Sequence, residues 1–249
     1  MNRPMLTDEL WLKLWPIMSQ NGIYDKPDLR LTIEGILYKL RVGCPWRDLP
    51  ASYWDWEKVY SRFNDWCKKL KLKNILESLI IEPDMEWKLI DGSIVKAHQH
   101  ACGARKGEER AIGKSVAGNT SKIHMVVDSH GNPIDFEITE GQVHDIQMAT
   151  ELIERTPQSS YTLADKGYDA EYFRWVIEET NSKALIPRKI NSTKSDLAFD
   201  RKIYKNRHKV ENVFARLKHF RSIATRFEKL KRNYESMVTL GCAYIWLKF

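Results

Sequence analysis

The chain has 249 residues, of which 43% are hydrophobic and 29% charged, and its mean hydropathy is −0.50. This length allows one large domain or two modest ones, and the composition is that of a soluble protein with a real core. The formal net charge is +7, which favours an anionic partner, most commonly nucleic acid.

The charge is concentrated in one block. Residues 188–232 carry 15 Lys and Arg side chains against 4 Asp and Glu, a net charge of +11, so the rest of the chain is net acidic. A solvated basic face without function is the alternative interpretation of such a block.

Other patterns exclude several classes of protein. The N-terminus has no continuous apolar core of the signal-peptide type, and the apolar segment 237–249 is too short to span a bilayer. That segment is predicted to be a buried terminal helix or strand. The four cysteines form no C-x-x-C pair, which argues against a zinc cage or a redox pair and suits free thiols in a reducing cytoplasm. We therefore expect a cytoplasmic protein without a membrane partner.

The first third of the chain is predicted to be helical. Apolar spacing indicates helices over 6–18, with Thr7 as the N-cap, and then over 28–41, 52–70 and 74–81. A helix–turn–helix outline of this size is familiar in DNA-reading modules, but no motif identifies base readout. DNA contact and simple packing both remain open for this unit.

From residue 86 onwards, the spacing of apolar residues changes from the helical period to the alternation typical of strands. The expected elements are a strand 87–91, a basic loop 98–121, a hairpin of strands 122–128 and 133–139, a helix to 155 capped by Asp145, a strand 161–165, a helix to 180 capped by Asp169, a strand 183–187, and a helix that reaches about residue 231. This order is that of the ribonuclease H-like fold, a mixed α/β sheet with flanking helices. We therefore predict an all-helical N-terminal domain, 1–84, which is the candidate for DNA binding, and a ribonuclease H-like domain, 85–249, which is the candidate catalytic domain.

Two acids end strands that this fold places side by side. Asp91 follows the first strand and Asp165 the fourth, at the carboxyl ends where open α/β sheets bind ligands. The final helix can direct Glu211 to the same point. On a helix, Tyr204, Arg207, Glu211 and Lys218 fall on one narrow stripe. The alternative is a surface helix with an ordinary Arg207–Glu211 pair.

Three converging carboxylates suit Mg²⁺, which takes oxygen ligands and keeps several waters. Two such ions can activate an attacking oxygen and stabilise the leaving oxygen of a phosphodiester. In this hypothesis Asp91 bridges both ions, Asp165 binds one and Glu211 the other. DNA phosphates are held by Tyr204, Arg207 and Lys218. Each acid alone has a structural alternative as a turn former, and the nearby competitors are Asp169, Asp128, Asp135 and Asp145.

These motifs resemble those of bacterial insertion-sequence transposases of the DDE type, in the group named for the fifth insertion-sequence family. The resemblance lies in IDGSIVKAH around Asp91, in ADKGYDA around Asp165, and in the spacing Y-x-x-R-x-x-x-E-x-x-x-x-x-x-K from Tyr204. CPWRDLP, HQHACGARKGEE and GQVHD also look like segments of this group. The resemblance implies Asp91, Asp165 and Glu211 as the metal-binding triad, with Mg²⁺ as cofactor and Mn²⁺ as a substitute. The loop 187–204 is short, so we expect it to lack any large insertion domain of the kind seen in related transposases.

The expected function is that of a DNA transposase. It would bind the terminal inverted repeats of its element, free 3′-hydroxyl ends and join them to double-stranded target DNA, as a dimer or larger assembly on DNA. Two rivals stay open: a ribonuclease H-like nuclease without strand transfer, and a DNA-binding regulator that is not an enzyme. The role of His144 is open between orienting a reacting group and a structural one, and His98, His100 and His124 are also unassigned.

Overall fold

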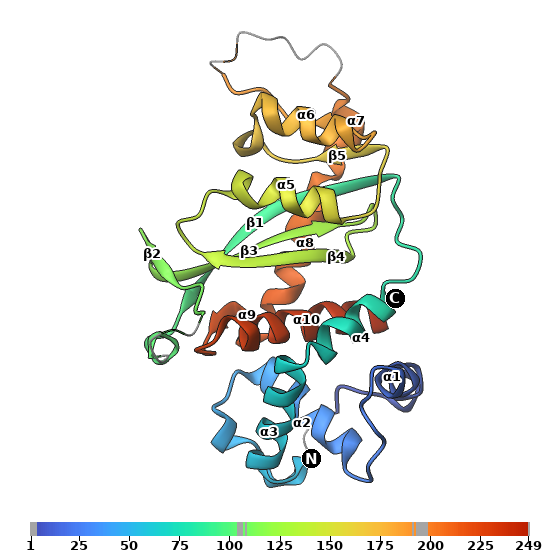
Figure 1. The fold of residues 1–249 in the computed structure, drawn as a ribbon, viewed down its shortest axis with the longest axis vertical. Coiled ribbons are helices and arrows are strands. Elements are labelled where there is room, and N and C mark those ends of the chain that lie inside the picture. The colour runs from blue at the N-terminus through green and yellow to red at the C-terminus, as the bar shows by residue number, and fades with distance from the viewer. Residues whose placement is uncertain (1–3, 104–106, 108, 191, 193–198, 249) are drawn as a thin grey trace. The chain divides into compact units, whose positions relative to one another are not determined.

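The computed structural model describes residues 4–103, 107, 109–190, 192 and 199–248 (Figure 1). The chain forms two compact units, each built from separate stretches of sequence. Unit 1 comprises Met1–Ile81, Lys96–Arg110 and Leu217–Phe249, and unit 2 comprises Glu82–Val95 and Ala111–Arg216. Unit 1 has 24 Lys and Arg side chains against 14 Asp and Glu, a net charge of +10, whereas unit 2 has 16 against 19, a net charge of −3.

Unit 1 is mainly helical. Its longer helices are α1 (Asp8–Gln20), α2 (Leu29–Val42), α3 (Trp56–Lys68), α4 (Lys71–Leu79) and α10 (Lys231–Leu247). Thr7 caps α1 as predicted, because its hydroxyl accepts from the Leu10 N–H at 3.2 Å. The helices α1, α2, α4 and α10 face one small apolar cavity. The side chains that line it include Leu14, Ile33 and Leu240. The apolar C-terminal segment is thus a helix buried on most sides, as expected for a helix without a polar face.

Two helices of the structure begin or end at other residues than the sequence predicted. The third helix begins at Trp56 because the preceding Ala51–Tyr53 is a 3-10 turn, η2, and Trp54 has a φ of 86°. The helix predicted to reach residue 231 ends at Lys218, because Phe220 has extended backbone angles. The chain then forms α9 (Arg221–Ala224) and β7 (Thr225–Arg226) before α10 begins.

Two further short elements of unit 1 are η1 (Trp46–Asp48) and η3 (Gln99–Cys102). The predicted domains 1–84 and 85–249 differ from the two compact units, because 96–110 and 217–249 pack within unit 1. The role of each predicted domain stays a prediction.

Unit 2 contains a mixed sheet. Its strands are β1 (Trp87–Ala97), β2 (Gly113–Ser115), β3 (Gly118–Val127), β4 (Pro133–Glu140), β5 (Tyr161–Leu163) and β6 (Lys183–Leu185). The order is β2-β3-β1-β5-β6, with β4 beside β3, and β7 pairs with the last two residues of β1. The strands β1, β5 and β6 are parallel, while β2, β3 and β4 are antiparallel. The predicted α/β class is confirmed, and the first and fourth predicted strands are neighbours.

Two predictions about strands are wrong. The first strand does not end at Asp91 but continues to Ala97. The predicted basic loop 98–121 contains β2 and the start of β3, which form a tight hairpin because Gly118 adopts a φ of 93°. Residues 104–106 and 108 of that loop lie outside the described residues, as do 191 and 193–198 of the loop predicted to lack an insertion.

The helices of unit 2 are α5 (Asp145–Arg155), α6 (Glu171–Glu179), α7 (Arg201–Tyr204) and α8 (His208–Lys218), of which α8 begins in this unit. In Figure 1, α5 lies across β3 and β4, which it contacts. A cluster of buried apolar side chains joins β1 and β3 to the helices α5 and α6. It includes Ile90, Val126, Leu152, Phe173 and Ile177. Within the described residues, no helix is both long and apolar enough to cross a membrane.

Candidate active site

The two strand acids lie side by side on neighbouring strands. In the parallel pair β1–β5, Leu89 is opposite Leu163, and Asp91 and Asp165 each follow two residues later. Residues two apart on a strand point to the same face. The charge of Asp165 raises the pKa of Asp91, which agrees with this proximity.

The Asp91 carboxylate is held by two donors. Its Oδ1 accepts from the N–H of Gly92 at 2.8 Å, and its Oδ2 accepts from Arg207 Nη1 at 3.1 Å. Burial raises the pKa of Asp91, and the charge of Asp165 acts in the same direction. The Gly92 N–H and the Arg207 charge lower it, but burial prevails. The surroundings of Asp91 therefore favour an added positive charge.

Asp165 also shapes the turn that follows β5. Its Oδ1 accepts from the N–H of Gly167 at 2.7 Å, at the start of the 3-10 turn η4 (Lys166–Tyr168). The turn-forming alternative is therefore observed, but it leaves the side chain partly exposed at the end of the strand. A carboxylate can serve both roles, because each oxygen has two lone pairs.

The competing acid Asp169 is engaged elsewhere. Its buried carboxylate pairs with Arg174 at 2.9 Å and Arg188 at 3.3 Å, and it accepts from the N–H of Lys189 at 2.7 Å. Burial alone would raise the pKa of Asp169, but these donors lower it. Asp169 is not the cap of the next helix, because Ala170 occupies that position in front of α6. These contacts make Asp169 a structural acid.

Three further competing acids have structural partners. Asp128 accepts from backbone N–H groups of its own turn, and Asp135 pairs with Arg155. Asp145 was predicted to cap α5, but His144 occupies the cap position. The Asp145 carboxylate lies 3.1 Å from Lys122 Nζ instead.

Arg207 connects Glu211 to Asp91. Its guanidinium contacts the Glu211 carboxylate through Nη2 while Nη1 donates to Asp91. The ordinary i,i+4 pair is therefore present, but the same side chain also reaches an acid 116 residues away. The 3-10 turn η5 (Lys205–Arg207) precedes α8, so the predicted helix 204–218 is not continuous α-helix.

The remaining residues of the stripe are Tyr204 and Lys218. Burial raises the pKa of Tyr204; the charge of Arg207 lowers it, and the charges of Asp165, Asp91 and Glu211 raise it. Lys218 is exposed and belongs to unit 1, whereas the acids belong to unit 2.

Sequence reasoning missed a layer of residues beside Asp91. A Cβ at Gly92 would come within 2.2 Å of Asp145 Oδ1, so the Asp145 carboxylate lies directly against the backbone of β1. The Tyr168 hydroxyl is buried with no hydrogen-bond partner among the described residues. Burial raises its pKa well above the usual value, and the charges of Asp145, Asp91 and Asp165 add to this. Both residues lie in motifs of the sequence, Asp145 in GQVHD and Tyr168 in ADKGYDA, but neither motif indicates that they lie beside Asp91.

Two of the unassigned histidines have clear surroundings. His124 is fully buried, contacts Thr139 Oγ1 at 2.8 Å, and has a pKa that burial lowers to about 4. It is therefore a neutral structural histidine at pH 7. His144 is exposed in front of α5, and its side chain does not cap that helix.

The donor chemistry of this site fits a divalent cation. Asp91, Asp165 and Glu211 offer only carboxylate oxygens, which Mg²⁺ prefers, and burial of Asp91 beside Asp165 leaves negative charge to neutralise. Over the ranges that the structure describes, however, no group of three His, Cys, Asp or Glu residues is arranged to hold a metal ion. Arg207 contacts both Asp91 and Glu211, so the guanidinium would have to leave for these two acids to share an ion.

Comparisons with known proteins agree with these motifs. The family described as "Transposase DDE domain" matches residues 83–246, and the family described as "Putative transposase of IS4/5 family" matches residues 6–76. The chain is 38% identical over 130 residues to the "Putative transposase for insertion sequence element IS6501" of Brucella ovis, which covers 52% of this chain and 99% of that protein.

A second relative is the "Putative transposase for insertion sequence element IS402" of Burkholderia cepacia, 29% identical over 136 residues, 50% of this chain and 62% of that protein. No solved structure matches the chain. The first family match covers well over half of the sequence and includes Asp91, Asp165 and Glu211. The chain therefore belongs to the DDE transposases of bacterial insertion sequences.

Proposed function

We propose that this transposase binds the terminal inverted repeats of its own insertion sequence, cleaves phosphodiester bonds to free 3′-hydroxyl ends, and joins those ends to target DNA. The observation that carries the proposal is the parallel register that sets Asp91 beside Asp165, with Arg207 linking Asp91 to Glu211. The proposed setting is the bacterial cytoplasm, at the nucleoid.

The proposed ligands of Mg²⁺ are Asp91, Asp165 and Glu211, with Mn²⁺ as a substitute. When bound, the metal would lower the pKa of the attacking water or hydroxyl and stabilise charge on the leaving oxygen. Arg207 would turn from the two carboxylates to a DNA phosphate, for which its planar fork is well suited. Tyr204 would donate its hydroxyl to a neighbouring phosphate, because a phenol is protonated at neutral pH and burial raises its pKa further. Lys218 would contribute a further phosphate contact.

The two units would have different functions, catalysis in unit 2 and most of the DNA binding in unit 1. The strand order and the family match support a ribonuclease H-like fold for the sheet of unit 2. The net charge of +10 supports unit 1, which includes the N-terminal helices, as the main DNA-binding surface. Two ends must be held together for joining, so the DNA-bound form is proposed to be a dimer or larger.

The central test compares the wild type with Asp91→Asn, Asp165→Asn and Glu211→Gln on labelled duplexes from the ends of the element. Each variant should bind end DNA with an affinity close to wild type and lose cleavage by a factor of about 10³ or more, as expected when charge stabilisation of a transition state is removed. Glu154→Gln is the matched control, because it removes an exposed acid of α5 in the same unit. Cleavage by any of the three variants at the wild-type rate would contradict its proposed role.

Pre-cut end DNA and a supercoiled plasmid separate the proposal from the nuclease rival. A transposase should yield a joined product, whereas a nuclease should yield cleavage alone. The regulator rival predicts neither reaction and an unchanged cellular effect of Asp91→Asn. DNA binding should weaken steeply with salt, since each phosphate contact releases counterions.

A further inference from the structure

Unit 1 contains a large pocket that the proposed chemistry does not use. Its volume is about 990 Å³, within the usual range for small-molecule sites. Four parts of the chain form it: the end of α2 with the turn that follows, α3, η3 with the residue after it, and the start of α10 with the segment that leads into it. All of the residues that line it belong to unit 1.

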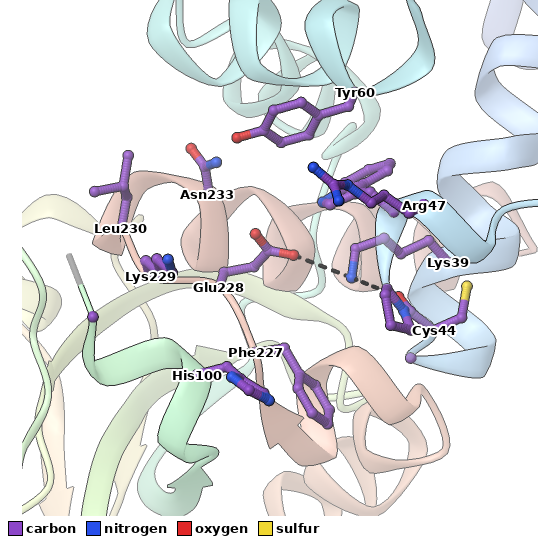
Figure 2. Close-up of a pocket in the computed structure, with 14 residues that line it drawn as sticks. Lys39, Cys44, Arg47, Tyr60, His100, Phe227, Glu228, Lys229, Leu230 and Asn233 are labelled. Atoms are coloured by element: carbon purple, nitrogen blue, oxygen red, sulfur yellow. Dashed lines mark hydrogen bonds and ion pairs between the residues drawn. The ribbon is translucent and has the colours of Figure 1, made fainter. Parts of the chain in front are cut away.

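Aromatic rings form opposite sides of this pocket. Figure 2 shows Tyr60 on one side and His100 with Phe227 on the other. Trp46 also lines the pocket, and the ammonium of Lys39 lies 5.0 Å from the centre of its ring. An aromatic face in the wall favours a planar ring system as the occupant, because stacking on such a face is sequence-tolerant and applies to every nucleobase.

Two buried polar groups of the lining have unmet hydrogen-bonding capacity. Asn233, only 3% exposed, points into the pocket from the first turn of α10 (Figure 2), and its Oδ1 has no partner among the described residues. The indole Nε1 of Trp46 is likewise buried and unpaired within the described part of the chain. Such groups are rare in folded proteins, and one acceptor with one donor matches the edge of a nucleobase.

The charge of the pocket favours an anion. Lys39 is neutralised by Glu228, whose carboxylate lies 3.2 Å from its ammonium, which leaves Arg47 and Lys229 as the exposed cations of the lining. The N-terminus of the 17-residue α10 adjoins Lys229, and its N-cap residue Leu230 supplies no side-chain cap. A phosphate at this position would gain from both the cation and the helix N-terminus.

We propose that this pocket binds one unpaired nucleotide, with the base against Tyr60 and Asn233 and the phosphate at Lys229 and the N-terminus of α10. An acidic peptide would use the cations but would leave the ring faces and the amide of Asn233 unexplained. The source of the nucleotide is a free mononucleotide or a base exposed from DNA, and the second source rests on the proposed function.

The test uses the full-length chain and calorimetric titration with dAMP, dCMP, dGMP and TMP, one at a time. A second arm measures binding of duplexes that are fully paired or that carry one unpaired base. Asn233→Leu removes the amide, and Lys229→Ala removes an exposed cation. Lys73→Ala, on the exposed side of α4 in the same unit, is the matched charge control.

We expect nucleotide binding that Asn233→Leu and Lys229→Ala each weaken by a factor of about ten, the effect of one lost hydrogen bond or charge contact, while Lys73→Ala leaves it unchanged. Binding of mononucleotides would show that the pocket takes a free nucleotide. Preference for the unpaired base over the paired duplex, lost in both variants, identifies DNA. Should Asn233→Leu fail to fold, Lys229→Ala decides the matter, because that side chain is exposed.

The proposal is overturned if no probe binds in a pocket-dependent way, or if Lys73→Ala weakens binding as much as Lys229→Ala. Cleavage of end DNA by the wild type is measured in parallel. Its failure would count against the proposed function, while the mononucleotide titration would still judge the pocket.

Discussion

The contact between Arg207 and Asp91 should contribute more to stability than the contact between Arg207 and Glu211. The Asp91 and Arg207 side chains are 20% and 22% exposed, and Arg207 Nη1 lies 3.1 Å from the carboxylate. Glu211 is 53% exposed and is only an i,i+4 neighbour. A largely buried charged hydrogen bond should give a coupling free energy of about 1–2 kcal/mol, against about 0.3–0.5 kcal/mol for the exposed pair.

Double-mutant cycles measure both values. One cycle combines Asp91→Asn with Arg207→Gln, and the other combines Glu211→Gln with Arg207→Gln. Unfolding by urea is followed in EDTA, so that no divalent ion competes with the guanidinium. The reasoning is refuted if the coupling of Arg207 to Asp91 is no larger than its coupling to Glu211.

The same cycle in saturating Mg²⁺ examines the proposed exchange of cations. If the ion takes the place of the guanidinium, the coupling between Arg207 and Asp91 should fall towards zero while Mg²⁺ stabilises the wild type. An undiminished coupling in the presence of bound Mg²⁺ would mean that Arg207 does not leave Asp91.

Three further predictions concern the surroundings of the site. Gly92→Ala should destabilise the protein by about 1–3 kcal/mol and reduce cleavage, because the new Cβ would displace the Asp145 carboxylate. Urea unfolding and the cleavage assay measure the two effects, and a variant with wild-type stability would contradict the prediction. Asp169→Asn should lower the free energy of unfolding by about 3–5 kcal/mol, because it leaves the charge of a buried arginine unpaired. Asp165→Asn should have little effect on stability. Thermal unfolding compares the two variants, and equal losses would contradict this reasoning. His124 has a folded-state pKa of about 4 against 6.5 when unfolded, so the unfolded chain binds more protons between these values and stability should fall as the pH falls from 6.5 to 4, by up to about 3 kcal/mol. His124→Gln should remove that part of the pH dependence, and parallel pH–stability curves of wild type and variant would count against it.

Much of the α/β part could be predicted because its signals are local. The hairpin of strands 122–128 and 133–139 and the helices α5 and α6 follow from periodicity. The neighbouring positions of Asp91 and Asp165 follow from the parallel pairing expected for their two strands. The extension of β1 past Asp91 could not be predicted, since Ala97 and its neighbour pair with β7, which is remote in sequence.

The contacts within the site were less accessible from the sequence. Spacing indicates that Arg207 and Glu211 are neighbours on a helix, but it cannot show that Arg207 also reaches Asp91, because that contact depends on how the helix lies on the sheet. The packing of Asp145 against Gly92 is likewise a tertiary contact. The placement of α10 within unit 1 depends on packing against helices near the other end of the chain, for which no local pattern exists.

The short β1–β5 ladder has a consequence for how this chain can diverge. Only three residue pairs, ending at Leu89 and Leu163, fix the separation of Asp91 and Asp165. One residue inserted between Leu89 and Asp91 would move that carboxylate by about 3.3 Å and turn it to the opposite face. Active homologues should therefore keep the spacing between the paired leucine position and each acid, while the length of chain that separates the two strands is free to vary.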